Sequence, residues 1–170
     1  MVLTPSIMSD LGKSAPPFAL RDTEAKKFTL DKCKGKHGLL VAFICNHCPY
    51  VKHVADEFAG IAKTLQTMDI GVVGINSNDT FKYPDDSVEN MDKEKAFRKY
   101  TFPYLWDADQ KVAKAYQAAC TPDFFLYNEN LKLFYRGQLD DSRPGNNIPV
   151  TGKDLMQAVE SMMTGKEPPQ

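Results

Sequence analysis

Two cysteines separated by two residues, Cys45 and Cys48, are the residues of this chain best suited to chemistry. A pair at this spacing can close a disulfide across one turn of a helix, and its thiolate form is a nucleophile toward other disulfides. The pair follows a continuous apolar run of strand length, 38–44, and precedes apolar residues at helical spacing over 49–67. We therefore expect a strand, the cysteine loop and a helix in that order. With Cys45 at the helix N-terminus, free N–H groups and the helix dipole would favour its thiolate.

The two residues between the cysteines are Asn46 and His47. An imidazole beside the pair should favour the Cys45 thiolate, stabilise the reduced form and make the disulfide a better oxidant. We expect Asn46 to shape the loop. The competing interpretation is one turn of helix with two buried, inert thiols, and the placement between a strand and a helix argues against it.

The rest of the chain supplies the elements that must position this loop. We predict an extended arm to residue 17, a short hairpin of 18–20 with 27–30, a second buried strand at 70–76, and a short strand at 104–106. Helices are predicted at 88–100, with Asp85, Asp86 and Ser87 as candidate caps, at 109–118 and at about 152–163, and a second hairpin joins 123–127 to 131–136. Strand–helix alternation followed by a hairpin predicts an α/β fold, a central mixed β-sheet flanked by helices, in a single domain over 1–170.

Composition narrows the function classes. The net charge of −1 gives no strong attraction to nucleic acid or anionic lipid, and no apolar run approaches the length of a membrane helix. Four cysteines in 170 residues are too few for a disulfide scaffold. The first twelve residues lack the pattern of a signal peptide, so we expect a cytoplasmic protein. In that reducing compartment a close cysteine pair is more indicative of chemistry than of structure, because purely structural disulfides are rare there.

Several motifs carry a family resemblance. The run Gly38-Leu-Leu-Val-Ala-Phe-Ile-Cys-Asn-His-Cys-Pro-Tyr-Val51 resembles the active-site strand and loop of the thioredoxin/redoxin superfamily, and is similar to its peroxiredoxin-like branch with a CNHCPYV motif. The resemblance continues through Gly74-Ile-Asn-Ser-Asn-Asp79, Tyr83-Pro-Asp-Asp-Ser87, Ala119-Cys-Thr-Pro-Asp-Phe-Phe125 and the run from Tyr135 to Gly145. It covers roughly residues 15 to 165.

The resemblance implies a thioredoxin-like fold and a cis-proline at Pro122, facing the cysteine pair. It also implies that the backbone at Thr121 pairs with an extended substrate, so Asn46, Thr121 and Pro122 are the expected substrate-binding residues. The chain departs from the usual active-site patterns of both thioredoxins and peroxiredoxins. Ile44 and Asn46-His47 replace the usual Trp and Gly-Pro of thioredoxins, and Cys45 replaces the hydroxyl residue of peroxiredoxins, whereas Cys48-Pro49 matches them.

Three further residues are candidates for support of the site. Cys120 could be a third thiol, a resolving cysteine or a metal ligand, or simply a small buried residue. Arg136 and Arg143 could polarise a peroxide, but each could equally be an ordinary surface arginine, and Asp140, Asp141 and Arg143 could form a local turn network. His53 could join Cys45 and Cys48 in a zinc or copper site.

These observations predict a thiol–disulfide oxidoreductase with Cys45, Cys48 and His47 as catalytic residues. Cys45 would attack a substrate disulfide and Cys48 would resolve the mixed disulfide. We expect no cofactor and no resident metal. The expected partners are a protein or small-molecule disulfide, or a peroxide, and a reductant such as thioredoxin or glutathione. The alternatives are a peroxiredoxin-like peroxidase, and a Cys/His protein that binds or delivers a metal.

Overall fold

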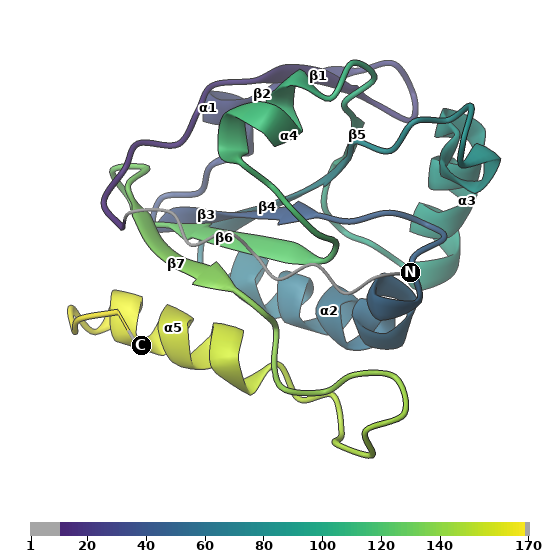
Figure 1. Cartoon of the computed structure of the whole chain (residues 1–170). Helices are drawn as coiled ribbons and strands as arrows, with labels where there is room; N and C mark the ends of the chain where they lie inside the picture. The colour runs from purple at the N-terminus through teal and green to yellow at the C-terminus, as the bar shows by residue number, and fades with distance from the viewer. Residues whose placement is uncertain (1–10, 169–170) are drawn as a thin grey trace.

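A mixed sheet of seven strands runs through the molecule in the order β2-β1-β5-β4-β3-β6-β7 (Figure 1). A computed structural model describes residues 11–168. The strands are β1 (Ala19–Asp22), β2 (Lys27–Thr29), β3 (Gly38–Phe43), β4 (Ile70–Asn76), β5 (Tyr104–Trp106), β6 (Asp123–Tyr127) and β7 (Leu133–Gly137). Strands β3, β4 and β5 are parallel, whereas both hairpins pair antiparallel, so the sheet is mixed as expected.

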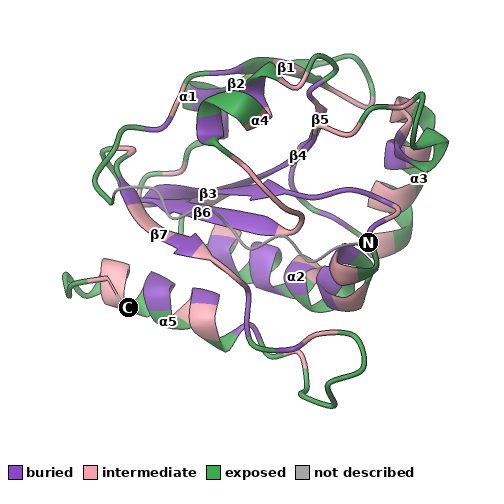
Figure 2. Ribbon diagram, in the orientation of Figure 1, coloured by how far each residue is buried: buried purple, intermediate pink, exposed green. Residues whose placement is uncertain are grey.

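The central strand β3 is covered on both faces, and all six of its residues are buried (Figure 2). Its side chains alternate between two cores, as the two-residue period of a strand requires. Leu40 and Ala42 belong to one core, while Leu39, Val41 and Phe43 belong to the other. This double coverage explains why the sequence has a continuous apolar run here rather than an alternating one.

Helices cover both faces of the sheet. Helices α2 (Pro49–Thr67), α3 (Val88–Arg98) and α5 (Lys153–Met163) contribute to the first core, and α2 and α5 lie on the same side of the sheet in Figure 1. The short helices α1 (Leu30–Cys33) and α4 (Lys111–Tyr116) contribute to the second core. The described residues contain no helix that is long and apolar enough to cross a membrane. The predicted α/β fold, with its N-terminal hairpin, is therefore confirmed.

Differences from the predicted elements lie at helix ends and in short turns. Helix α3 ends at Arg98 because Lys99 adopts a left-handed conformation. Helix α4 is shorter than predicted, since Gln110 and Gln117 are left-handed at its two ends. The 3-10 helix η1 (Pro84–Asp86) was expected only as a cap region for the next helix. These ends depend on local backbone geometry that apolar periodicity does not report.

Candidate active site

The cysteine loop lies where β3 leaves the sheet and α2 begins. Helix α2 begins at Pro49, so its N-cap is Cys48 and not Cys45. A proline is well suited to the first helical position, because the N–H group that it lacks would have no intrahelical partner. The N–H groups of Tyr50 and Val51 instead interact with the Cys48 sulfur. The expectation that Cys45 occupies the helix N-terminus is therefore wrong by three residues.

Both thiols are free and close together, and their environments differ. A hydrogen bond joins their side chains. This bond and the helix N-terminus lower the pKa of Cys48 to about 5. The same bond, burial and the nearby Asp86 carboxylate raise the pKa of Cys45 well above the ordinary thiol range. These contacts favour the thiolate at Cys48 over the thiolate at Cys45.

Thr121 and Pro122 face the pair, as the resemblance implied. The Thr121–Pro122 peptide bond is cis. The Thr121 hydroxyl lies 3.7 Å from the Cys45 sulfur, and its carbonyl oxygen lies 3.6 Å from the Cys48 sulfur. Residues 121–122 precede β6, which pairs with β3, so the antiparallel register carries this loop to the strand end that bears the cysteines.

Asn46 points into the protein. It is only 6% exposed; its side-chain amide donates to the Asp85 carbonyl oxygen, and its Oδ1 accepts a hydrogen bond from the Tyr104 hydroxyl. It shapes the loop, as predicted. Its side-chain contacts are made within the protein, so its expected role in substrate binding is not supported by the geometry.

The residue that sequence reasoning missed is Asp86, which was expected only as a helix cap. Its carboxylate is fully buried and pairs with Nδ1 of His47. The Cys45 sulfur, a His47 ring nitrogen and an Asp86 oxygen all lie within 4.8 Å of one another. The charge of the Asp86 carboxylate opposes ionisation of Cys45 and raises its pKa. The expected influence of His47 on the Cys45 thiolate stays a prediction. The sequence signal was the run Tyr83-Pro-Asp-Asp-Ser87, but nothing in it shows that it folds back onto the cysteine loop.

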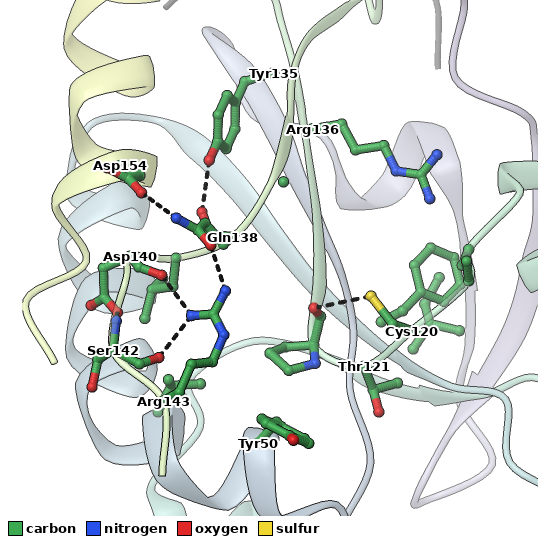
Figure 3. Close-up of a pocket in the computed structure, with 18 of the residues that line it drawn as sticks. Tyr50, Cys120, Thr121, Tyr135, Arg136, Gln138, Asp140, Ser142, Arg143 and Asp154 are labelled. Carbon is green, nitrogen blue, oxygen red and sulfur yellow. Dashed lines mark hydrogen bonds between the residues drawn. The ribbon is translucent and has the colours of Figure 1, made fainter. Parts of the chain in front are cut away.

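A cavity of about 940 Å³ adjoins the thiols through Thr121 and Pro122, which line it (Figure 3). Tyr50 of α2 lines one side, and the loop after β7 lines another. The wall carries charges of both signs, from Arg136, Arg143, Asp140, Asp141 and Asp154. A dithiol beside a roomy cavity, whose largely apolar wall carries several charged groups, can receive an extended substrate.

Comparison with known proteins agrees with this architecture. Residues 11–136 match the model of the AhpC/TSA family. The chain belongs to this family. Among curated proteins, the chain is 29% identical over 122 residues to the thiol-disulfide oxidoreductase ResA of Bacillus subtilis (strain 168), a match that covers 72% of the chain and 64% of ResA. The match therefore spans less than two thirds of that relative.

Two solved structures are much more similar to this AhpC/TSA family member. An uncharacterized conserved protein from Geobacillus kaustophilus is 47% identical, with a TM-score of 0.97 over 100% of this chain and 90% of that one. A hypothetical protein from Sinorhizobium meliloti 1021 is 45% identical, with a TM-score of 0.96 over 99% and 92%. The thioredoxin domain of a thiol-disulfide oxidoreductase from Bacteroides vulgatus is 18% identical, with a TM-score of 0.69 over 91% and 98%, and so shares the thioredoxin-like fold.

The two arginines that were predicted to support the site, Arg136 and Arg143, make contacts within the protein. Arg136 is buried, pairs with Asp123 at 2.8 Å and lies over the Phe125 ring. Arg143 binds the carbonyl oxygens of Asp140 and Ser142 and the Gln138 side chain, which confirms the alternative of a local turn network (Figure 3). Their expected role in polarising a peroxide therefore has no support from these contacts.

The residues expected to complete a metal site are also placed elsewhere. His53 Nε2 lies 2.6 Å from the Ser142 hydroxyl, and the Cys120 sulfur lies 4.0 Å from the Pro122 carbonyl oxygen, on the cavity wall. The described residues that could share an ion are instead Cys45, His47 and Asp86. Both oxygens of Asp86 accept hydrogen bonds within this group, from the Asn46 backbone and from the Asn78 side chain.

Proposed function

We propose that this protein is a thiol–disulfide oxidoreductase that cycles Cys45 and Cys48 between the dithiol and the disulfide. The observation that carries the proposal is the contact of both sulfurs with each other and with Thr121, on the wall of the cavity. A dithiol that holds one thiolate and one thiol side by side is ready for a two-step exchange.

The position of Cys48 at the N-terminus of α2 supports one order of attack. The Cys48 thiolate attacks one sulfur of a substrate disulfide, so a Cys48–substrate mixed disulfide forms and the other half of the substrate leaves as a thiolate. Cys45 then loses its proton and attacks the Cys48 sulfur. This releases the second thiolate and leaves the Cys45–Cys48 disulfide. Two electrons pass to the substrate, and a reducing thiol partner, of the thioredoxin or glutathione class, returns them.

The cavity suggests the substrate. Thr121 and Pro122 line the cavity, which suits an extended chain that carries a disulfide, and charged groups on its largely apolar wall favour a peptide with both apolar and charged side chains. The cytoplasmic location stays a prediction.

Trapping the mixed disulfide tests the proposal and the order of attack. With a disulfide-containing peptide, the Cys45→Ser variant should accumulate a stable adduct at Cys48, because the resolving thiol is gone. The Cys48→Ser variant should form an adduct far more slowly, since the Cys45 thiol is protonated. Mass spectrometry identifies the modified cysteine. Adducts only in Cys48→Ser would reverse the order of attack, and no exchange by the wild-type dithiol would overturn the proposed activity.

A peroxidase is the second candidate, favoured by a specific observation. Cys48 has a pKa of about 5, caps a helix and precedes Pro49 in a member of the AhpC/TSA family. In this reaction the thiolate takes one oxygen atom from a peroxide to become a sulfenic acid, and Cys45 condenses with it to release water. Peroxide consumption by the reduced protein, together with a dimedone-labelled sulfenic acid at Cys48 in Cys45→Ser, would favour this reaction. Rapid disulfide exchange with slow peroxide turnover would exclude it as the main activity.

A further inference from the structure

Asp86 is a buried carboxylate held by donors from three separate segments. Its Oδ1 lies 2.6 Å from the Asn46 backbone nitrogen and 3.2 Å from Nδ2 of Asn76. Its Oδ2 lies 2.9 Å from Nδ2 of Asn78 and pairs with His47. A carboxylate is an acceptor-only group that can satisfy about four donors, so Asp86 is fully committed in this position. A buried acid of this kind has a defined geometry and no freedom to turn toward solvent.

His47 is fixed by two of its neighbours. Asp86 holds Nδ1, and the Tyr83 ring stacks on the imidazole with centroids 4.4 Å apart and planes 7° from parallel. The His47 side chain is 20% exposed, so protons can reach solvent from it. A carboxylate that orients an imidazole beside a thiol is the arrangement that makes an imidazole an effective base toward that thiol.

Cys45 is the thiol that needs such a base. In the proposed exchange it must lose its proton before it can attack the Cys48 sulfur, yet burial and the Asp86 charge hold that proton in place. A His47 ring nitrogen lies within 4.8 Å of the Cys45 sulfur. One bridging water or a small side-chain rotation spans this gap, and such contacts commonly tighten when a substrate is bound.

We propose that His47 is the base that removes the proton from Cys45 in the second step of the exchange, and that Asp86 is the positioning residue that holds His47 for this transfer. The proposal rests on the proposed oxidoreductase function. In the step, the Cys45 S–H bond breaks and its proton moves to the imidazole. The thiolate then forms the Cys45–Cys48 bond, and the substrate thiolate leaves. His47 returns its proton to that thiolate or to water.

A chromogenic aromatic disulfide separates the two steps. The first attack releases one coloured thiolate, and resolution by Cys45 releases the second, so rapid mixing resolves two phases of equal amplitude. His47→Gln and Asp86→Asn should leave the first phase within about twofold of wild type. They should slow the second phase by on the order of 10²-fold, the usual contribution of general base catalysis.

The pH profile distinguishes proton transfer from a merely structural role. Without the base, Cys45 must be ionised by hydroxide, so the second phase of both variants should rise with pH over a range where wild type is level. Added imidazole should partly restore the second phase of His47→Ala, because the His47 position is accessible to a small molecule. The matched controls are His37→Gln, at the opposite end of β3, and the exposed neighbour Asp85→Asn. Both should keep wild-type phases.

Each outcome decides between the two proposals. Loss of the first phase in wild-type protein would overturn the exchange activity itself. A normal first phase with a second phase unchanged in His47→Gln and Asp86→Asn would overturn the role of the His47–Asp86 pair alone. Equal slowing of both phases, without a change in pH profile and without rescue by imidazole, would also overturn it and would indicate a distorted loop.

Discussion

At the residue scale, two cysteines three positions apart have opposite environments. The sulfur of Cys48 faces the N–H groups of the first turn of α2, while Cys45 lies next to the buried Asp86 carboxylate. The difference comes from where the helix begins, since the N-terminal N–H groups point at only one of the two sulfurs. The residue at which the helix begins thus favours the thiolate at Cys48 over the thiolate at Cys45.

The ionisation of the reduced pair is a direct test at this scale. We expect ultraviolet thiolate absorbance to report one ionisation near pH 5, from Cys48, while Cys45 stays protonated through neutral pH. Rates of alkylation should show the same midpoint. The Cys48→Ser variant should lose the transition near pH 5. A first midpoint near the ordinary thiol value of 9.0 would contradict this assignment.

The same ionisation predicts how stability depends on pH. The folded pKa of Cys48 lies below the ordinary thiol value of 9.0, so the stabilisation from its thiolate is complete above pH 9 and is lost as the pH falls toward 5. The free energy of unfolding of the reduced wild type, relative to Cys48→Ser, should therefore fall progressively from pH 9 to pH 5. Urea unfolding under reducing conditions measures it, and a difference that is independent of pH would contradict the prediction.

At the scale of elements, the strands bring the site together. Strand β3 delivers the cysteines, its parallel neighbour β4 leads to Asn76 and Asn78, and its antiparallel neighbour β6 begins beside Thr121. All three meet at one edge of the sheet, because parallel strands share their carboxyl ends and an antiparallel neighbour begins there. The position of β4 also depends on its other end, where the backbone at Gly71 lies close to the backbone of Cys33 and Gly35.

Gly71 of β4 tests that close approach. A Cβ atom at this position would lie 2.0 Å from the Cys33 carbonyl oxygen and 2.9 Å from the Gly35 nitrogen, both of which are backbone atoms. We expect Gly71→Ala to lower the free energy of unfolding by about 2 kcal/mol or more, as overpacking of a rigid site does. Gly60→Ala in α2 is the matched control. It meets nothing within 4 Å and should stabilise the protein by about 0.5–1 kcal/mol. Equal changes in the free energy of unfolding for the two variants, measured with urea, would contradict the close packing at Gly71.

At the scale of the whole molecule, the sheet separates two apolar cores, and a buried ion pair joins its last two strands. Asp123 at the start of β6 and Arg136 of β7 are both fully covered at their side chains. Arg136 also donates to the Gln117 carbonyl oxygen beyond α4. One guanidinium group thus connects the start of β6, strand β7 and the end of α4 beside the cavity wall.

Removal of one partner of the buried Asp123–Arg136 pair should lower the free energy of unfolding substantially. Asp123→Ala leaves the Arg136 charge buried without its carboxylate, and we expect a loss of about 3–5 kcal/mol in unfolding free energy. The exposed pair of Glu89 and Lys93 on α3 is the control, since Glu89→Ala disturbs only a solvated contact and should have a several-fold smaller effect. Thermal and urea unfolding of both variants measure this. Similar losses in the two variants would mean that the buried pair contributes no more than a surface one.

The main strands and helices, the mixed sheet and the cysteine pair after its central strand could all be predicted from the sequence. Those features follow from local signals: the apolar run before Cys45, the helical spacing after Cys48, and turn residues between strands. The family motifs added Thr121 and the cis form of Pro122, which local propensity could not supply.

The ionisation of the two thiols depends on tertiary contacts that no local sequence signal reveals. Asp86 lies 38 to 41 positions from the two cysteines in sequence and contacts the loop only because η1 folds back over the end of β4. The start of α2 at Pro49, rather than near Cys45, likewise depends on the geometry in which the chain leaves the sheet. Thiol ionisation is set by the charges and N–H groups within a few ångströms, whichever part of the chain supplies them.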